Sequence, residues 1–279
     1  MGVMVTKANG SRQLFDRNKI VKTCMRMGAT RRDALEVAGK IEKRLYDGIS
    51  TAKILQMLFQ FMRKYKPHFG QIYDLRKGLS LMASKPEFEI FVQNLLSHNG
   101  FDVSSNRILK GKCIEHEVDG IAKKNGVTYL VEAKHHVNYH IFTGLDESRI
   151  ARAVLEDVTE GYDLGRGGLK IDKAMIITNT KYSDYATQYG VCKDILQIGW
   201  STPANLSLQS MIEEKSLYPL SCVKGLNIDT RLRLVDSGLV LINQIMEEDS
   251  LALARKTGLP LEAISKLRAK MEPIDFLRY

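Results

Sequence analysis

Residues 116–136, H-E-V-D-G-I-A-K-K-N-G-V-T-Y-L-V-E-A-K-H-H, decide the fold of this chain. Their Asn-Gly pair is the strongest short-range signal for a two-residue β-turn, so strands are expected at 113–122 and 127–136 as an antiparallel hairpin. With the Asn-Gly pair as the loop, Lys124 pairs with Val127, and each further pair lies one residue along each strand. The stretch therefore predicts the hairpin and its register.

In this register Asp119 faces Glu132, and Glu117 faces Lys134. Side chains alternate along a strand, so these four residues and His136 project from one face of the hairpin. The other face is predicted to be apolar and carries Val127, Tyr129, Val131 and Ala133. Two directly opposed carboxylates repel each other and destabilise a strand pair, so a cation is needed beside them.

That cation is either a metal ion or the ammonium of Lys134. Mg²⁺ prefers carboxylate oxygens and keeps several waters, and a coordinated water becomes a nucleophile at neutral pH. Lys134 lies one pleat from Glu132 and could orient that water or stabilise charge in a transition state. The alternative is an exposed strand face whose charges merely compensate one another, which is common.

The elements around the hairpin predict an α/β domain. A helix is expected at 87–98, a strand at 101–107 and a second helix at 146–161. The last elements predict a βαβ crossover, and therefore a partly parallel sheet; they are a strand at 173–180, a helix at 183–192 and a strand at 195–200.

The first part of the chain is predicted to be a small hairpin followed by helices. A strand at 3–8, the turn Asn9-Gly10 and Asp16 as a helix N-cap come first. Helices are then expected at about 31–46, 51–64 and 69–83. Lys85-Pro86 breaks this pattern, and three short helices are expected between 228 and 272. The domains predicted are 1–84, 85–223 and 224–279.

Charge is distributed unevenly over these three parts. The whole chain has 41 Lys and Arg against 32 Asp and Glu, a net charge of +9, and the excess of basic residues lies in 1–84. A basic domain beside a more acidic one indicates a polyanionic partner, either nucleic acid or nucleotide phosphate. The alternative is a well-solvated basic surface.

The sequence does not predict a membrane or secreted protein. No run approaches the roughly 18 apolar residues that a membrane span needs, and the N-terminus has no apolar signal segment. The four cysteines form no CxxC pair, so neither a zinc site nor a disulfide framework is indicated. A cytoplasmic protein with no membrane partner is expected.

The hairpin and its surroundings resemble the PD-(D/E)xK nuclease superfamily. The motifs H-E-V-D-G-I-A and Y-L-V-E-A-K-H-H are most similar to Mrr-like restriction endonucleases and archaeal Holliday-junction resolvases, with Val118 in place of the proline. The preceding helix F-E-I-F-V-Q-N-L-L resembles the helix that opens that fold. The resemblance spans roughly 85–205 and implies a mixed-sheet restriction-endonuclease-like core.

The resemblance also implies site residues and a cofactor. Asp119, Glu132 and the main-chain carbonyl of Ala133 would bind Mg²⁺ or Mn²⁺, with Glu89 joining through water. Lys134 would lie beside the attacking water, so the catalytic set is Asp119, Glu132, Lys134 and Glu89. Three further residues are candidates for contact with DNA, and each has a surface role as its alternative: His136, Arg149 and Arg152.

The first domain resembles an ATP-cone, a domain that binds ATP or dATP and regulates ribonucleotide reductases. The motifs that carry the resemblance are V-T-K-A-N-G-S-R-Q-L-F-D-R-N-K-I and Y-D-G-I-S-T-A-K-I. By position, Lys7 and Lys19 would contact phosphate, and Asp16 and Thr51 would lie nearer the base or the helix start. The alternative is a basic helical domain that binds DNA directly.

Together these features predict a Mg²⁺-dependent DNA endonuclease, expected as a homodimer, that is modulated by ATP or dATP. A helical tail that resembles a helix-hairpin-helix module, or serves dimerisation, follows the nuclease core. The alternatives are a nucleotide-responsive DNA-binding regulator with an inactive nuclease fold, and a structure-specific junction resolvase.

Overall fold

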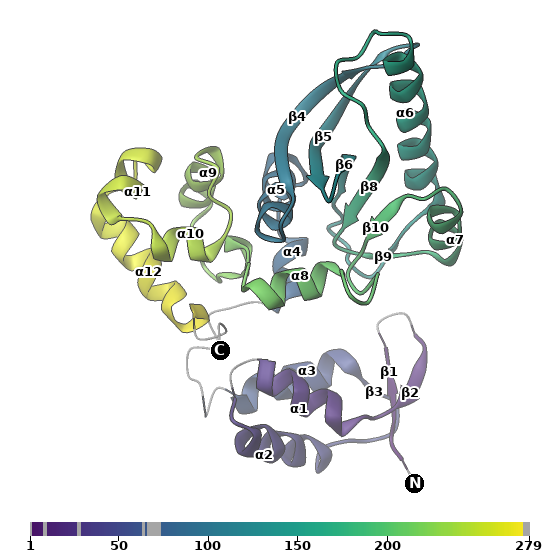
Figure 1. The fold of residues 1–279 in the computed structure, drawn as a ribbon. Coiled ribbons are helices and arrows are strands. Elements are labelled where there is room, and N and C mark those ends of the chain that lie inside the picture. Colours follow the sequence, from purple (N-terminus) through teal and green to yellow (C-terminus); the bar gives the residue numbers. More distant parts are fainter. Residues whose placement is uncertain (1, 8–9, 27–28, 63–64, 66–73, 276–279) are drawn as a thin grey trace. The chain divides into compact units, whose positions relative to one another are not determined.

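The computed structural model describes residues 2–7, 10–26, 29–62, 65 and 74–275. The chain forms two compact units, drawn in Figure 1. Unit 1 contains residues 1–72, 223–225 and 262–279, and unit 2 contains residues 73–222 and 226–261. The domain boundaries predicted from the sequence stay predictions.

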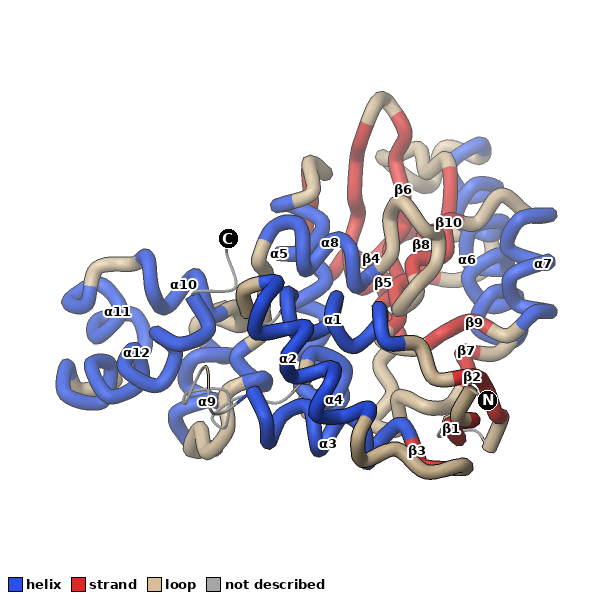
Figure 2. The backbone as a smooth tube through the Cα atoms, turned by 90° about the horizontal axis from the view of Figure 1, so that it is seen from below, coloured by secondary structure: helices blue, strands red, loops and turns tan. Residues whose placement is uncertain are grey.

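Unit 2 is built on a five-stranded mixed sheet in the order β10-β8-β6-β5-β4 (Figure 2). Strands β4, β5 and β6 pair antiparallel, whereas β6, β8 and β10 pair parallel. The bounds are Asp102–Lys110 for β4, Glu115–Lys124 for β5, Val127–Lys134 for β6, Lys173–Thr178 for β8 and Leu196–Ile198 for β10. The predicted α/β class and the predicted parallel pairing are confirmed.

The predicted register of the hairpin is confirmed from the turn inward. Lys124 pairs with Val127, and the ladder continues to Gly120 and Val131. Asn125 and Gly126 both have positive φ, as a tight hairpin turn requires. The ladder ends there, so the predicted oppositions of Asp119 to Glu132 and of Glu117 to Lys134 lie beyond the paired segment.

Helices cover the two faces of this sheet (Figure 1). Helix α5 (Glu89–His98) packs in one core with Val131, Met175 and Ile177, and helix α6 (Leu145–Asp163) packs in the other with Leu130 and Ile176. Neighbouring strand residues thus fall in opposite cores, as the two-residue period of a strand requires. Both α5 and α6 were predicted within a few residues.

Short elements complete unit 2, and several of them carry too few residues for a periodic signal. These are α4 (Leu75–Ser80), a π-helical turn (Ser84–Phe88), β7 (Phe142–Thr143), β9 (Lys181–Tyr182), α7 (Asp184–Cys192), α8 (Leu208–Lys215), a 3₁₀ turn (Leu220–Cys222), α9 (Ile228–Asp236), α10 (Ile242–Glu247) and α11 (Ser250–Thr257).

The predicted number of helices in the tail was wrong. The described residues contain α9, α10 and α11 and then α12 (Leu261–Asp275), which is four helices in place of three. The side chain of Asp249 accepts hydrogen bonds from the backbone amides of Leu251 and Ala252. This cap starts α11 as a separate helix only a few residues after α10 ends.

Unit 1 contains a small sheet and helices. The sheet has the order β2-β1-β3, formed by Arg12–Leu14, Met4–Thr6 and Ile49–Ser50. The helices are α1 (Arg17–Arg26), α2 (Arg31–Glu42), α3 (Thr51–Met62) and nearly all of α12. Asp16 accepts a hydrogen bond from the amide of Asn18, which confirms its predicted capping role. Asn9 and residues 69–73 of the predicted last helix lie outside the described residues.

No helix among the described residues is long and apolar enough to cross a membrane.

Candidate functional site

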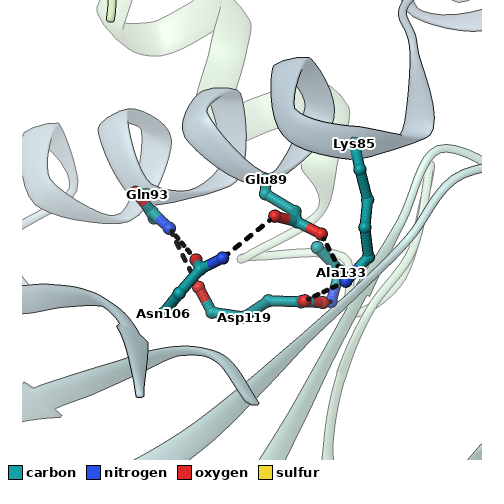
Figure 3. Close-up of polar contacts among 6 residues, drawn as sticks. All are labelled: Lys85, Glu89, Gln93, Asn106, Asp119 and Ala133. Carbon is teal, nitrogen blue, oxygen red and sulfur yellow. Dashed lines mark hydrogen bonds and ion pairs between the residues drawn. The ribbon is translucent and has the colours of Figure 1, made fainter. Parts of the chain in front are cut away.

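Asp119 is fixed on β5 by contacts from two other elements (Figure 3). Its Oδ2 atom accepts a hydrogen bond of 2.8 Å from the backbone N–H of Ala133 on β6. Its own backbone oxygen accepts a hydrogen bond of 2.9 Å from the side chain of Gln93 on α5. The carboxylate is therefore buried at the point where the paired part of the β5–β6 hairpin ends.

Glu89 lies in the first turn of α5 and points toward Asp119 (Figure 3). Its side chain is 4% exposed, and its Oε2 atom lies 3.4 Å from the amide nitrogen of Asn106 on β4. The Nζ atom of Lys85 lies 3.0 Å from Oε1 of Glu89 and 3.5 Å from Oδ1 of Asp119. One ammonium ion thus bridges two buried carboxylates.

Burial and the neighbouring charge of Asp119 raise the pKa values of Glu89 and Glu132. Burial raises the pKa of Glu89, and the neighbouring Lys85 ammonium partly offsets that effect. Burial is also the main reason that the pKa of Glu132 is raised to about 7, with the charge of Asp119 adding to it. The contact with Glu89 raises the pKa of Lys85.

Lys134 follows Glu132 by two residues and is held by α6. Its Nζ atom lies 2.8 Å from Oε1 of Glu147, in the first turn of that helix. The structure therefore brings Asp119, Glu132 and Lys134 to one end of the sheet, between the start of α5 and the start of α6.

The donor set fits a divalent cation in its chemistry. Asp119, Glu132 and Glu89 offer carboxylate oxygens, the ligands that Mg²⁺ and Mn²⁺ prefer. The buried Oε1 atom of Glu89 has no hydrogen-bond partner of good geometry, but it lies 3.0 Å from the ammonium of Lys85 in an ion pair. Among the described residues, no group of three or more His, Cys, Asp or Glu side chains is gathered closely enough to hold a metal as it stands.

The predicted DNA-contact residues all have partners within the protein. The Nε2 atom of His136 lies 3.1 Å from Oγ1 of Thr143, and burial lowers the pKa of its half-buried ring. Arg149 and Arg152 make ion pairs along α6, with Asp146 at 3.4 Å and with Glu156 at 2.9 Å. Their contact with DNA stays a prediction.

The sequence reasoning missed four residues that build this site. Gln93 follows Glu89 by four residues on α5, so the helical period was a usable signal for it. Lys85 precedes α5 with a non-helical backbone, and no periodic signal points to it. Asn106 and Glu147 reach the site from β4 and α6, and no local pattern points to them.

A basic pocket of about 500 Å³ lies elsewhere in unit 2. Among the described residues that line it none is acidic, and its cations are Arg107, Lys110, Lys123 and Arg166. The first three come from β4 and β5, and Arg166 comes from the loop after α6, where it donates a hydrogen bond to the backbone oxygen of Lys112. The pocket is suited to an anion.

Unit 1 contains a smaller pocket of about 140 Å³. Asp16, Lys19 and Thr51, three of the four predicted nucleotide-binding residues, line it together. Its remaining lining is mostly apolar and includes Val5, Phe15, Ile20, Ile54, Leu55 and Leu58. Lys7, the fourth predicted residue, is exposed and is not part of the lining.

Comparison with known proteins agrees with both parts of this description. Residues 3–68 match the ATP cone domain family, and residues 81–196 match the restriction endonuclease family of the Mrr catalytic type. An uncharacterized protein of Archaeoglobus fulgidus is 32% identical over 183 residues, which cover 64% of this chain and 97% of that protein.

A solved structure also resembles this chain. The crystal structure of AF1548, a protein of unknown function, is 30% identical and superposes with a TM-score of 0.59 over 67% of this chain and 96% of that one. The chain belongs to the family of Mrr-like restriction endonuclease domains and carries an ATP cone domain in front of that domain.

Proposed function

We propose that this protein is a metal-dependent DNA endonuclease. The observation that carries the proposal is the meeting of Asp119, Glu132 and Lys134 at one end of the sheet, with Glu89 in contact through Lys85. Two carboxylates beside a lysine, with the pKa of Glu132 raised by burial, are the arrangement expected where phosphodiester hydrolysis is catalysed.

Each residue has a separate role in this proposal. Asp119, Glu132 and the carbonyl of Ala133 would hold Mg²⁺ or Mn²⁺, and Glu89 would act through water. A bound divalent cation supplies Lewis acidity, which acidifies water and neutralises phosphate charge. The hydrogen bond from Ala133 to Asp119 fixes the carboxylate in place beforehand, so little reorganisation is needed.

Lys134 stabilises the negative charge that develops during hydrolysis. Its ammonium is presented from the same strand as Glu132, two residues further on, and is oriented by Glu147. A partly buried cation held in one position contributes more than a freely hydrated one does. Glu147 acts as a positioning residue because it contacts Lys134 and not the reacting atoms.

The basic pocket supports DNA as the partner. Lys and Arg side chains that bind backbone phosphates hold a duplex in position without reading its sequence. Cutting both strands of a duplex requires two catalytic sites, and we therefore propose that the protein acts as a homodimer.

The ATP cone domain supports regulation by ATP or dATP. Lys19 would neutralise phosphate, and Asp16 and Thr51 would contact the nucleoside or the helix start, in the pocket that they share. Lys7 would add a second phosphate contact. For the nucleotide to regulate cleavage it must bind two states of the protein with different affinity.

Cleavage of supercoiled plasmid DNA tests the proposal. Wild type and Lys134→Met are incubated with Mg²⁺ or Mn²⁺, with and without ATP, beside Lys112→Met as a control for lost surface charge. The expected result is nicking by wild type and by Lys112→Met but not by Lys134→Met. DNA binding without cleavage under any of these conditions would instead support the regulator with an inactive nuclease fold.

A further inference from the structure

Lys85 reaches from the protein surface into a buried acidic pair (Figure 3). Its side chain is 67% exposed, whereas the side chains of Glu89 and Asp119 are 4% and 8% exposed. The Nζ atom contacts both carboxylates, at 3.0 Å and 3.5 Å. The ammonium therefore lies at the position where both acids present their oxygens.

A cation at this position stabilises both acids in their ionised form. Two ionised carboxylates buried side by side destabilise each other unless a positive charge lies beside them or one of them takes up a proton. An ammonium and a divalent metal both satisfy that need, but they use the same oxygen lone pairs and carry charges that repel. The two cations therefore compete for Glu89 and Asp119.

The exposure of Lys85 makes this competition reversible. Its long side chain can rotate into water, where an ammonium is well hydrated, while the two carboxylates stay anchored on α5 and β5. Gln93 and Ala133 hold Asp119 independently of Lys85, so the acidic pair survives the departure of the ammonium.

We infer that Lys85 is a resident counter-cation that a divalent metal must displace, and that it lowers the affinity of the nuclease site for metal. The inference deepens the proposed function, on which it rests. It gives the protein an acidic pair that is partly neutralised without metal, and that binds metal only when the metal concentration is high enough to displace the lysine.

Calorimetric titration of Mn²⁺ into the full-length protein, without DNA, tests this inference. The variant is Lys85→Met, and its matched control is Lys112→Met, which also removes an exposed ammonium paired with a carboxylate, Glu160 at 2.9 Å. We expect Lys85→Met to bind Mn²⁺ about tenfold more tightly than wild type, on the scale expected for removal of one adjacent like charge. Lys112→Met should bind as wild type does.

The site of the effect is checked with the double variant Lys85→Met/Asp119→Asn, in which the gain in affinity should disappear. If Lys85→Met does not fold, Lys85→Gln carries the same test with a polar neutral side chain. An unchanged or weaker Mn²⁺ affinity in the folded Lys85 variant would overturn the inference while leaving the metal-dependent nuclease intact. A failure of both wild type and the variant to bind Mn²⁺ would overturn the inference together with the proposed function.

Discussion

The carboxylate of Asp119 accepts a hydrogen bond from the backbone N–H of Ala133, with Oδ2 and N 2.8 Å apart. The two residues lie just beyond the last paired residues of the β5–β6 hairpin. This bond ties a charged side chain to the strand that carries Glu132 and Lys134. It makes Asp119 a structural residue as well as a candidate metal ligand, and the two roles can be separated by mutation.

Asp119→Asn and Asp119→Ala should differ in stability. The amide oxygen of Asn can still accept the Ala133 hydrogen bond, whereas Ala leaves a partly buried N–H without this partner, at a cost of about 1 kcal/mol. Urea unfolding in EDTA should therefore rank Asn above Ala, and neither variant should bind Mn²⁺ as wild type does. Equal stability of the two variants would show that the hydrogen bond contributes nothing.

Glu132 should make the metal-free protein less stable at alkaline pH. Its pKa in the folded state is about 7, against an ordinary value of 4.5, so the folded protein binds the proton more tightly than the unfolded chain does. The free energy of unfolding therefore falls as pH rises from 4.5 to 7, and the penalty is complete above 7.

Glu132→Gln removes that penalty, because the amide does not ionise. In EDTA at pH 8 the variant should exceed wild type by on the order of 1–3 kcal/mol, and near pH 4 the difference should disappear. Urea denaturation at the two pH values measures both quantities. A variant that is no more stable than wild type at pH 8 would argue against a raised pKa.

The ion pair between Arg231 and Glu87 should be important for the stability of unit 2. Arg231 contacts both carboxylate oxygens of Glu87, at 2.8 Å and 2.6 Å, and the Glu87 side chain is almost fully buried. Arg231→Met leaves that carboxylate without its partner, so a loss of about 3–5 kcal/mol is expected on chemical denaturation. Lys266→Met, which breaks an exposed pair with Glu262, should cost under about 1 kcal/mol.

Lys19→Ala should weaken nucleotide binding and spare the nuclease site. Lys19 lines the pocket of unit 1 with Asp16 and Thr51, where its ammonium can neutralise phosphate. In a fluorescence titration we expect the dissociation constant for ATP or dATP to be at least tenfold higher than in wild type, with Mn²⁺ binding unchanged. Lys53→Ala, on α3 but outside the pocket lining, is the control; an equal loss there would point to a general charge effect.

Charge reversal in the basic pocket should weaken DNA binding. Arg107→Glu and Lys123→Glu each change a cation that lines the pocket, whereas Lys193→Glu changes an exposed cation outside it. Anisotropy with labelled duplex DNA should show weaker binding for the first two and a salt dependence lower by roughly one unit of slope per lost phosphate contact. Wild-type affinity for DNA in both pocket variants would show that this pocket does not bind DNA.

The hairpin could be predicted from sequence because its signals are local. The Asn-Gly turn set the register, and alternation placed Val131 on an apolar face, which the structure packs in the core with α5. The burial of Leu130 in the core on the opposite face was not predicted. Glu132 and Lys134 followed from the same pattern, because residues two apart on a strand share a face.

The parts that could not be predicted depend on contacts between distant segments. Asn106 and Glu147 approach the site from elements that only the folded sheet brings near Glu89 and Lys134. Lys85 was interpreted as a domain boundary because it precedes a proline, and its role as a cation became visible only when Asp119 was placed beside it. Very short strands such as β3 lack the length for a periodic signal.

Nicking of supercoiled plasmid as a function of Mn²⁺ concentration is the most direct test of a metal-dependent nuclease site at Asp119. Wild type and Asp119→Asn are compared after both are shown to be folded. We expect wild type to nick DNA only when the cation is present, EDTA to stop the reaction, and Asp119→Asn to be inactive at every Mn²⁺ concentration. Nicking that persists in EDTA, or that Asp119→Asn performs as fast as wild type, would contradict this expectation.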